Sequence, residues 1–194
     1  MIFIYFFLAG KTYWASLTHG LMAVGFLLLM NIMDEKKLLI SQISLLNSII
    51  YFVADLFVRF NYGKTFHHIL CTFGFIMALF LSPEVIIFTA KLCGLIEMTN
   101  PFWTFLRLRI DKSNEIPLPS CCTKLIAGTV YVLVFFIIRI VWFSIVLYYE
   151  TPIDIPLKLY YKALALFYIM NAVFFIVLIF GFIQAIKKEY KIPK

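Results

Sequence analysis

The fold of this chain is decided by apolar stretches such as residues 124–148, KLIAGTVYVLVFFIIRIVWFSIVLY. After Lys124 at its start, the only charged residue in this stretch is Arg139. About 20 apolar residues in a helix, rising about 1.5 Å per residue, cross the roughly 30 Å hydrocarbon core of a bilayer. The stretch therefore predicts a membrane-spanning helix.

The rest of the chain has the same character. Apolar residues make up 63% of its 194 residues and charged residues only 14%, whereas a soluble domain carries about 25% charged residues. The apolar runs predict six membrane spans, at residues 12–31, 38–59, 66–82, 84–106, 124–148 and 160–186. Little sequence remains outside them, so residues 1–194 are predicted to form a single all-α, polytopic membrane domain.

The connection between the third and fourth spans is short. Ser82, Pro83 and Glu84 suit a helix start, with a capping hydroxyl, a proline at the first helical position and a carboxylate near the positive end of the helix dipole. These residues predict a tight helical hairpin.

The distribution of basic residues predicts the orientation. Eleven of the 17 Lys and Arg residues flank one side of the predicted bundle and four flank the other. Because cytoplasmic segments carry the excess of Lys and Arg, both termini are expected in the cytosol. This topology also accounts for the net charge of +7, so nucleic acid is not an expected partner.

Polar residues inside the spans are the candidates for function, because an ionisable group at the bilayer centre costs about 3 kcal/mol. They are His19, Asp55, His67, His68, Lys91, Glu97, Arg139 and Asn171. Counting about 1.5 Å per residue places the histidines, Asp55 and Glu97 in the cytosolic half, with Arg139 and Asn171 near or beyond the midplane. Taken singly, each is explained by hydrogen bonding between helices. As a set they indicate a site, since every histidine of the chain lies at similar depth near a carboxylate.

The chemistry of this set suits acyl transfer. A neutral imidazole accepts a proton from an amine or hydroxyl, or takes an acyl group itself, and a carboxylate fixes its tautomer. Asp55 is the predicted carboxylate partner. Neighbouring residues on a helix point about 100° apart, so His67 and His68 are expected to face different surroundings.

Residues 55–68, DLFVRFNYGKTFHH, resemble the signature of the TLC domain, the family of the ceramide synthases and the TRAM translocation protein. His19 is similar to the early histidine of that family, and residues 97–102, EMTNPF, are similar to a motif of its non-ceramide-synthase branch. Ceramide synthases carry a pair of aspartates where this chain has Glu97 and Thr99, and they have extra sequence before the domain. The resemblance therefore favours the small TLC-domain proteins, which are implicated in ceramide formation, phospholipid acyl composition and cargo export from the endoplasmic reticulum.

The resemblance implies six helices around a central lipid cavity that opens to the cytosol and accepts a long acyl chain. We expect an acyltransferase of the endoplasmic reticulum or a related endomembrane, in which His67 or His68 is the base or acyl carrier and Asp55 orients it. The expected substrate-binding residues are His19, Glu97, Arg139, Asn171, Arg107 and Arg109. Acyl-CoA would be the donor substrate and membrane lipids the partners, with no tightly bound cofactor.

Two other functions fit the same residues. One is a non-enzymatic lipid-binding or cargo-escort protein whose polar cluster recognises a headgroup. The other is a zinc-dependent hydrolase, which is disfavoured because no HExxH-like pair places two ligands on one helical face, and no metal site is predicted. Acyl transfer in the bundle requires a tunnel of about 20 Å for a 16-carbon chain, beginning near His67.

Overall fold

The computed structural model describes residues 12–58, 62–102, 121–152 and 158–189, and every element in these ranges is helical. The elements are α2 (Thr12–Ile32), η1 (Asp34–Lys36), α3 (Lys37–Val58), α4 (Tyr62–Leu79), α5 (Pro83–Glu97), α7 (Cys121–Phe135), η3 (Phe136–Trp142), α8 (Phe143–Glu150) and α9 (Lys158–Glu189). Beyond a turn at Met98, helical structure continues from Thr99 to Phe102.

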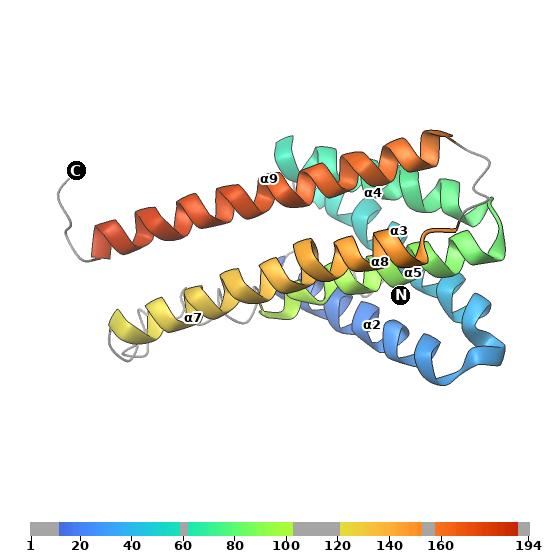
Figure 1. Ribbon diagram of the computed structural model, residues 1–194, viewed down its shortest axis with the longest axis horizontal. Coiled ribbons are helices and arrows are strands. Elements are labelled where there is room, and N and C mark those ends of the chain that lie inside the picture. The colour runs from blue at the N-terminus through green and yellow to red at the C-terminus, as the bar shows by residue number, and fades with distance from the viewer. Residues whose placement is uncertain (1–11, 59–61, 103–120, 153–157, 190–194) are drawn as a thin grey trace.

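The helices correspond closely to the six predicted spans. η3 is a π-helix that joins α7 to α8 without a break, so these three elements form one rod (Figure 1). In the described ranges, five helices are long and apolar enough to cross a membrane, and α4 supplies a sixth, shorter apolar helix. The prediction of an all-α polytopic membrane protein is confirmed.

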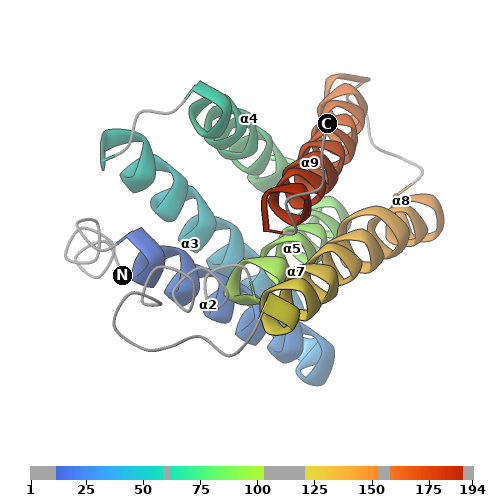
Figure 2. The same cartoon turned by 90° about the vertical axis from the view of Figure 1, so that its left-hand side faces the viewer.

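Helix α5 lies in the interior of the bundle. It packs against α2, α3, α4, η3 and α8, and two thirds of its span (67%) is buried. The end-on view shows α5 among the other helices, with α9 at the edge between α4 and the α7–α8 rod (Figure 2). Only 6% of the α9 span is buried. Because α5 fills the centre, any cavity must lie beside it.

The hairpin between α4 and α5 follows the prediction in position but differs in one detail. Pro83 is the first residue of α5 and Ser82 is its N-cap. The backbone N–H of Ile86 donates to the Ser82 carbonyl at 3.1 Å, whereas the Ser82 side chain makes no capping hydrogen bond. The prediction that the Ser82 hydroxyl caps α5 is therefore wrong, and the helix begins with a backbone hydrogen bond.

A close helix contact joins α2 to α5. A Cβ atom placed on Gly20 would lie 2.7 Å from Cδ of Pro101 and 3.2 Å from the Glu97 carbonyl oxygen. The absence of a side chain therefore lets α2 approach the C-terminal part of α5. This approach brings His19, the neighbour of Gly20, beside Glu97.

Helix α9 contains 32 residues and is about 48 Å long. With α7 it projects past the other helices at one end of the bundle (Figure 1). The two projecting segments contact each other, with stacked rings of Phe135 and Phe175 at 6.1 Å and with Gly128 against the ring of Phe182. We call this the histidine end, where α3 ends and α4 begins, and the opposite end the hairpin end, where α4 meets α5.

Candidate functional site

A carboxylate and an imidazole meet between the last turn of α3 and the second turn of α4. Asp55 Oδ2 lies 3.3 Å from His68 Nδ1, and the two side chains are 11% and 9% exposed. The short connection from α3 to α4 brings these turns together. The prediction that Asp55 approaches at least one of the adjacent histidines is confirmed.

His67 faces a different part of the bundle. Its ring stacks on Phe167 of α9 at 5.6 Å and meets the edge of Phe174 at 5.8 Å. One turn further along α4, Cys71 Sγ lies 3.6 Å from His67 Nδ1. The two histidines therefore have different surroundings, as their helical offset predicts.

Aromatic side chains of α3 join these histidines to the third. Tyr51 stacks on His19 with ring centroids 4.1 Å apart. Phe52 contacts both His19, at 5.6 Å, and His68, at 4.8 Å. All three histidines of the chain therefore lie around one buried pair of aromatic rings.

His19 also approaches a second carboxylate. Its Nε2 lies 3.5 Å from Glu97 Oε2, and both side chains are buried, at 0% and 4% exposure. The Asn100 side-chain amide donates a hydrogen bond to the same Glu97 oxygen. Glu97 therefore connects the histidines to the polar residues at the end of α5.

Arg139 completes the network from the π-helix η3. Its Nε donates to Thr99 Oγ1 at 2.8 Å, while Nη2 donates to Asn100 Oδ1 at 3.2 Å and Nη1 donates to Asn171 Oδ1 at 3.3 Å. The guanidinium is buried and lies 5.0 Å from the centre of the Phe135 ring. Because π-helical turns often mark functional or strained positions, the widened turn at Arg139 is itself informative.

The structure corrects the predicted depths of Arg139 and Asn171. Both belong to the same hydrogen-bonded group as Asn100, beside Glu97, instead of lying deeper in the bundle. The physical reason is the length of their helices. Because α7 and α9 project past the others at the histidine end, counting residues from a helix end overestimates depth for these two helices.

The hydrogen bonds of Arg139 mainly join side chains of different helical segments. Three donors of Arg139 are used by side chains of α9 and of the segment after Met98. Bonds of this kind hold helices together in membranes. The arrangement therefore supports a positioning role for Arg139 and Asn171, while Asp55 and half-buried His67 remain closer to the surface of the bundle.

Several buried polar residues were not among the residues predicted from the sequence. A stripe on α3 comprises Ser41, Ser44, Asn47 and Ser48, none more than 1% exposed. Ser48 Oγ and Cys93 Sγ are 3.3 Å apart, and Ser41 Oγ donates to the Lys37 carbonyl at 2.7 Å. Their spacing of three to four residues within an apolar span was the available signal, because small polar residues at that spacing mark helix contacts in membranes.

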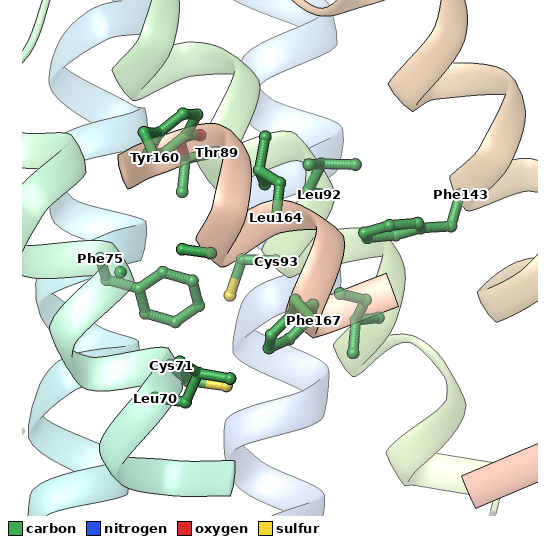
Figure 3. Close-up of a pocket in the computed structure, with 13 residues that line it drawn as sticks. Leu70, Cys71, Phe75, Thr89, Leu92, Cys93, Phe143, Tyr160, Leu164 and Phe167 are labelled. Carbon is green, nitrogen blue, oxygen red and sulfur yellow. The ribbon is translucent and has the colours of Figure 1, made fainter. Parts of the chain in front are cut away.

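An apolar cavity lies between α4, α5, α8 and α9 (Figure 3). Its volume is about 40 Å³, and its lining extends from Cys71 and Phe167 near the histidine end to Thr89 and Tyr160 near the hairpin end. The hydroxyls of Thr89 and Tyr160 are hydrogen-bonded to each other. Tyr160 and Phe167 lie about 10 Å apart along α9.

This cavity differs from the predicted tunnel. It is about half as long, and neither His67 nor His68 lines it, although Cys71 and Phe167 contact His67 and line the cavity. This cavity is therefore not the predicted 20 Å tunnel beginning at the histidines. Helix α5 occupies the centre of the bundle, and the rings of Phe75 and Phe167 line the space beside it.

The remaining predicted residues lie elsewhere. Arg107 and Arg109 fall outside the described residues. Lys91 lies far from the histidines along α5, where it forms an ion pair with Glu150. Within the described ranges, no group of three or more His, Cys, Asp or Glu side chains is arranged to hold a metal ion.

The geometry thus joins His19, Asp55, His67, His68 and Glu97 around Tyr51 and Phe52, with an apolar cavity adjacent to His67. This arrangement provides proton acceptors and donors beside an apolar compartment. Comparison of the chain with protein-family models, with curated proteins and with solved structures found no match.

Proposed function

We propose that this chain is a lipid-binding membrane protein of the escort type. In this proposal an acyl chain occupies the cavity between α4 and α9, and the polar part of the lipid contacts Asp55 and His67. The observation that carries the proposal is the apolar cavity whose wall, at Cys71 and Phe167, contacts His67. An apolar cavity with a few polar groups at one end is typical of ligand sites.

Admission of an acyl chain requires the cavity to widen, because about 40 Å³ holds only a small part of a chain. Helix α9 forms one wall and has the smallest buried share of the five long spans in the described ranges. Because most of its residues face outward, we take α9 as the wall that moves, and the movement must open the hydrogen bond between Thr89 and Tyr160. A lipid would therefore enter sideways from the bilayer, between α4 and α9.

Binding without chemistry is favoured over acyl transfer for a geometric reason. Transfer requires the reacting atoms to lie about 3–3.5 Å apart, so the acyl carbonyl must reach an imidazole. The cavity is shorter than a 16-carbon chain requires, and its lining includes neither His67 nor His68.

We include in the proposal membership of the TLC family, residence in the endoplasmic reticulum or a related endomembrane, and cytosolic termini.

Acyl transfer is the second candidate, and one observation favours it. Asp55 and His68 form a carboxylate–imidazole pair at 3.3 Å, the arrangement that orients a general base. The acyl group would pass from acyl-CoA to a lipid amine or hydroxyl. This candidate needs the same cavity, with a chain long enough to bring its carbonyl to the pair.

The cavity offers a matched pair of substitutions to test lipid binding. A Cβ on Gly74 or on Gly181 would meet no atom within 4 Å, but only Gly74 lines the cavity. Gly74→Leu should fill the cavity. It should lower the affinity for a lipid carrying a photoreactive acyl chain at least tenfold, as measured by crosslinking in nanodiscs. Gly181→Leu should leave crosslinking unchanged. Equal crosslinking of both variants would exclude the cavity as the acyl site.

A second experiment separates the two candidates. Asp55→Asn preserves the size of the side chain but removes its charge beside His68. The escort proposal expects this variant to keep most of its bound lipid, because the asparagine amide can still hydrogen-bond the polar part of the lipid, and to leave cellular lipid composition unchanged. Loss of one acylated lipid species, with lipid binding retained, would favour acyl transfer instead.

A further inference from the structure

A larger cavity lies at the hairpin end, away from the histidines. Its volume is about 270 Å³, and it lies between α2, α5 and α8. We call it the charged cleft, because its lining includes the side chains of Lys37, Glu84, Lys91 and Glu150. Its apolar lining includes Leu27 and Ile87.

Lys91 and Glu150 form the centre of the charged cleft. Lys91 Nζ lies 2.6 Å and 2.5 Å from the two carboxylate oxygens of Glu150. Lys91 is about 12 Å from Pro83 along α5, inside the span, and it pairs there with Glu150, the last residue of α8. Both side chains stay partly accessible, at 31% and 43% exposure, because they border the cavity. Ionisable groups inside membrane spans are rare, and they usually mark a functional site.

The charge balance of the cleft restricts its ligand. The two lysines and two glutamates of the lining give a net charge of zero, and Asp34 lies 3.5 Å from Lys37, so the cleft is not suited to a strongly anionic molecule such as acyl-CoA. The lysines likewise oppose the binding of a lone cation. A molecule that carries both a phosphate and an ammonium group matches both signs at once. The volume far exceeds the roughly 10–15 Å³ that one water requires, which leaves room for such a group.

We propose that the charged cleft binds the headgroup of a zwitterionic phospholipid from the leaflet at the hairpin end. The phosphate would contact the ammonium groups of Lys91 and Lys37, and the lipid ammonium would contact Glu84 and Glu150. Leu27 and Ile87 would meet the first carbons of the acyl chains. This site is separate from the cavity beside His67 and does not depend on the function proposed for it.

The test is native mass spectrometry of the full chain in detergent micelles, with dioleoyl phosphatidylethanolamine as the probe. Lys91→Met should weaken retention of this lipid at least tenfold. Glu84→Gln should weaken it as well, and it provides a second variant because Glu84 is exposed at the first turn of α5. Lys162→Met is the matched control, since Lys162 is exposed near the same end but does not line the cleft.

Two further measurements complete the test. Dioleoylglycerol, which lacks the headgroup, should be retained at least tenfold less than the phospholipid. Lys91→Met should cause the same fractional loss of phospholipid in the Gly74→Leu background as in the unchanged protein, which separates this site from the cavity beside His67. If folded Lys91→Met and Glu84→Gln proteins retain the phospholipid as strongly as the unchanged protein, the proposal is overturned. Displacement of the phospholipid by an equal concentration of soluble phosphoethanolamine would also overturn it, because the cleft would then serve a soluble ligand.

Discussion

Gly20→Ala should weaken the contact between α2 and α5 that holds His19 beside Glu97. The new methyl group would lie 2.7 Å and 3.0 Å from two ring carbons of Pro101 and 3.2 Å from the Glu97 carbonyl oxygen. A proline ring and a backbone carbonyl cannot turn aside as the end of a flexible side chain can. Helix α2 must therefore move away from α5.

The expected magnitude follows from two opposing effects. Overpacking of a rigid contact costs about 1–3 kcal/mol. Replacement of a glycine within a helix by alanine stabilises the helix by up to about 1 kcal/mol. Gly25→Ala on the same helix isolates the second effect, because a Cβ there would meet no atom within 4 Å. The difference in free energy of unfolding between the two variants should therefore be about 1–3 kcal/mol, with Gly20→Ala the less stable.

The assay is titration of each purified variant from mild detergent into sodium dodecyl sulfate, with the loss of helical structure followed by circular dichroism. The displacement of α2 should also separate His19 from Tyr51, on which it now stacks at 4.1 Å. If Gly20→Ala proves as stable as Gly25→Ala, α2 and α5 are not in the contact described, and the proximity of His19 to Glu97 is wrong as well.

Three other outcomes are expected. Arg139→Met should lower the free energy of unfolding in the same titration by about 3 kcal/mol, because it leaves the buried partners of the guanidinium unpaired. The control Lys162→Met, at an exposed position, should change the free energy of unfolding little. Equal effects of the two substitutions would refute the network. Gly128→Ala should force the ring of Phe182 in the projecting α7–α9 pair to turn aside, at a smaller cost than that of Gly20→Ala, and Phe182→Leu in the same protein should restore most of the loss; a purely additive double mutant would contradict this contact. A tag after Lys194 should be accessible from the cytosol in cells with intact internal membranes, and access only after the luminal leaflet is opened would reverse the topology.

The sequence by itself determined the number and positions of the membrane-spanning helices within the described ranges. Runs such as residues 124–148 leave no alternative in a bilayer, since every backbone polar group must be paired within its own helix. The hairpin at Pro83 and the different surroundings of His67 and His68 were also predictable, because proline position and the helical offset are local properties. The approach of Asp55 to one of the two adjacent histidines followed from the short connection between their helices, and the structure shows that this histidine is His68.

Only the tertiary structure decided how the helices pack, because the bilayer provides almost no hydrophobic difference between one apolar helix face and another. The sequence did not indicate that α5 fills the centre, that the cavity beside it is short, or that Arg139 and Asn171 meet at the level of Asn100. It also placed Lys91 among the polar residues of one candidate site, whereas Lys91 pairs with Glu150 in a separate charged cleft. These features depend on small residues such as Gly20, whose partners lie far away in sequence, and on helix lengths that exceed the membrane.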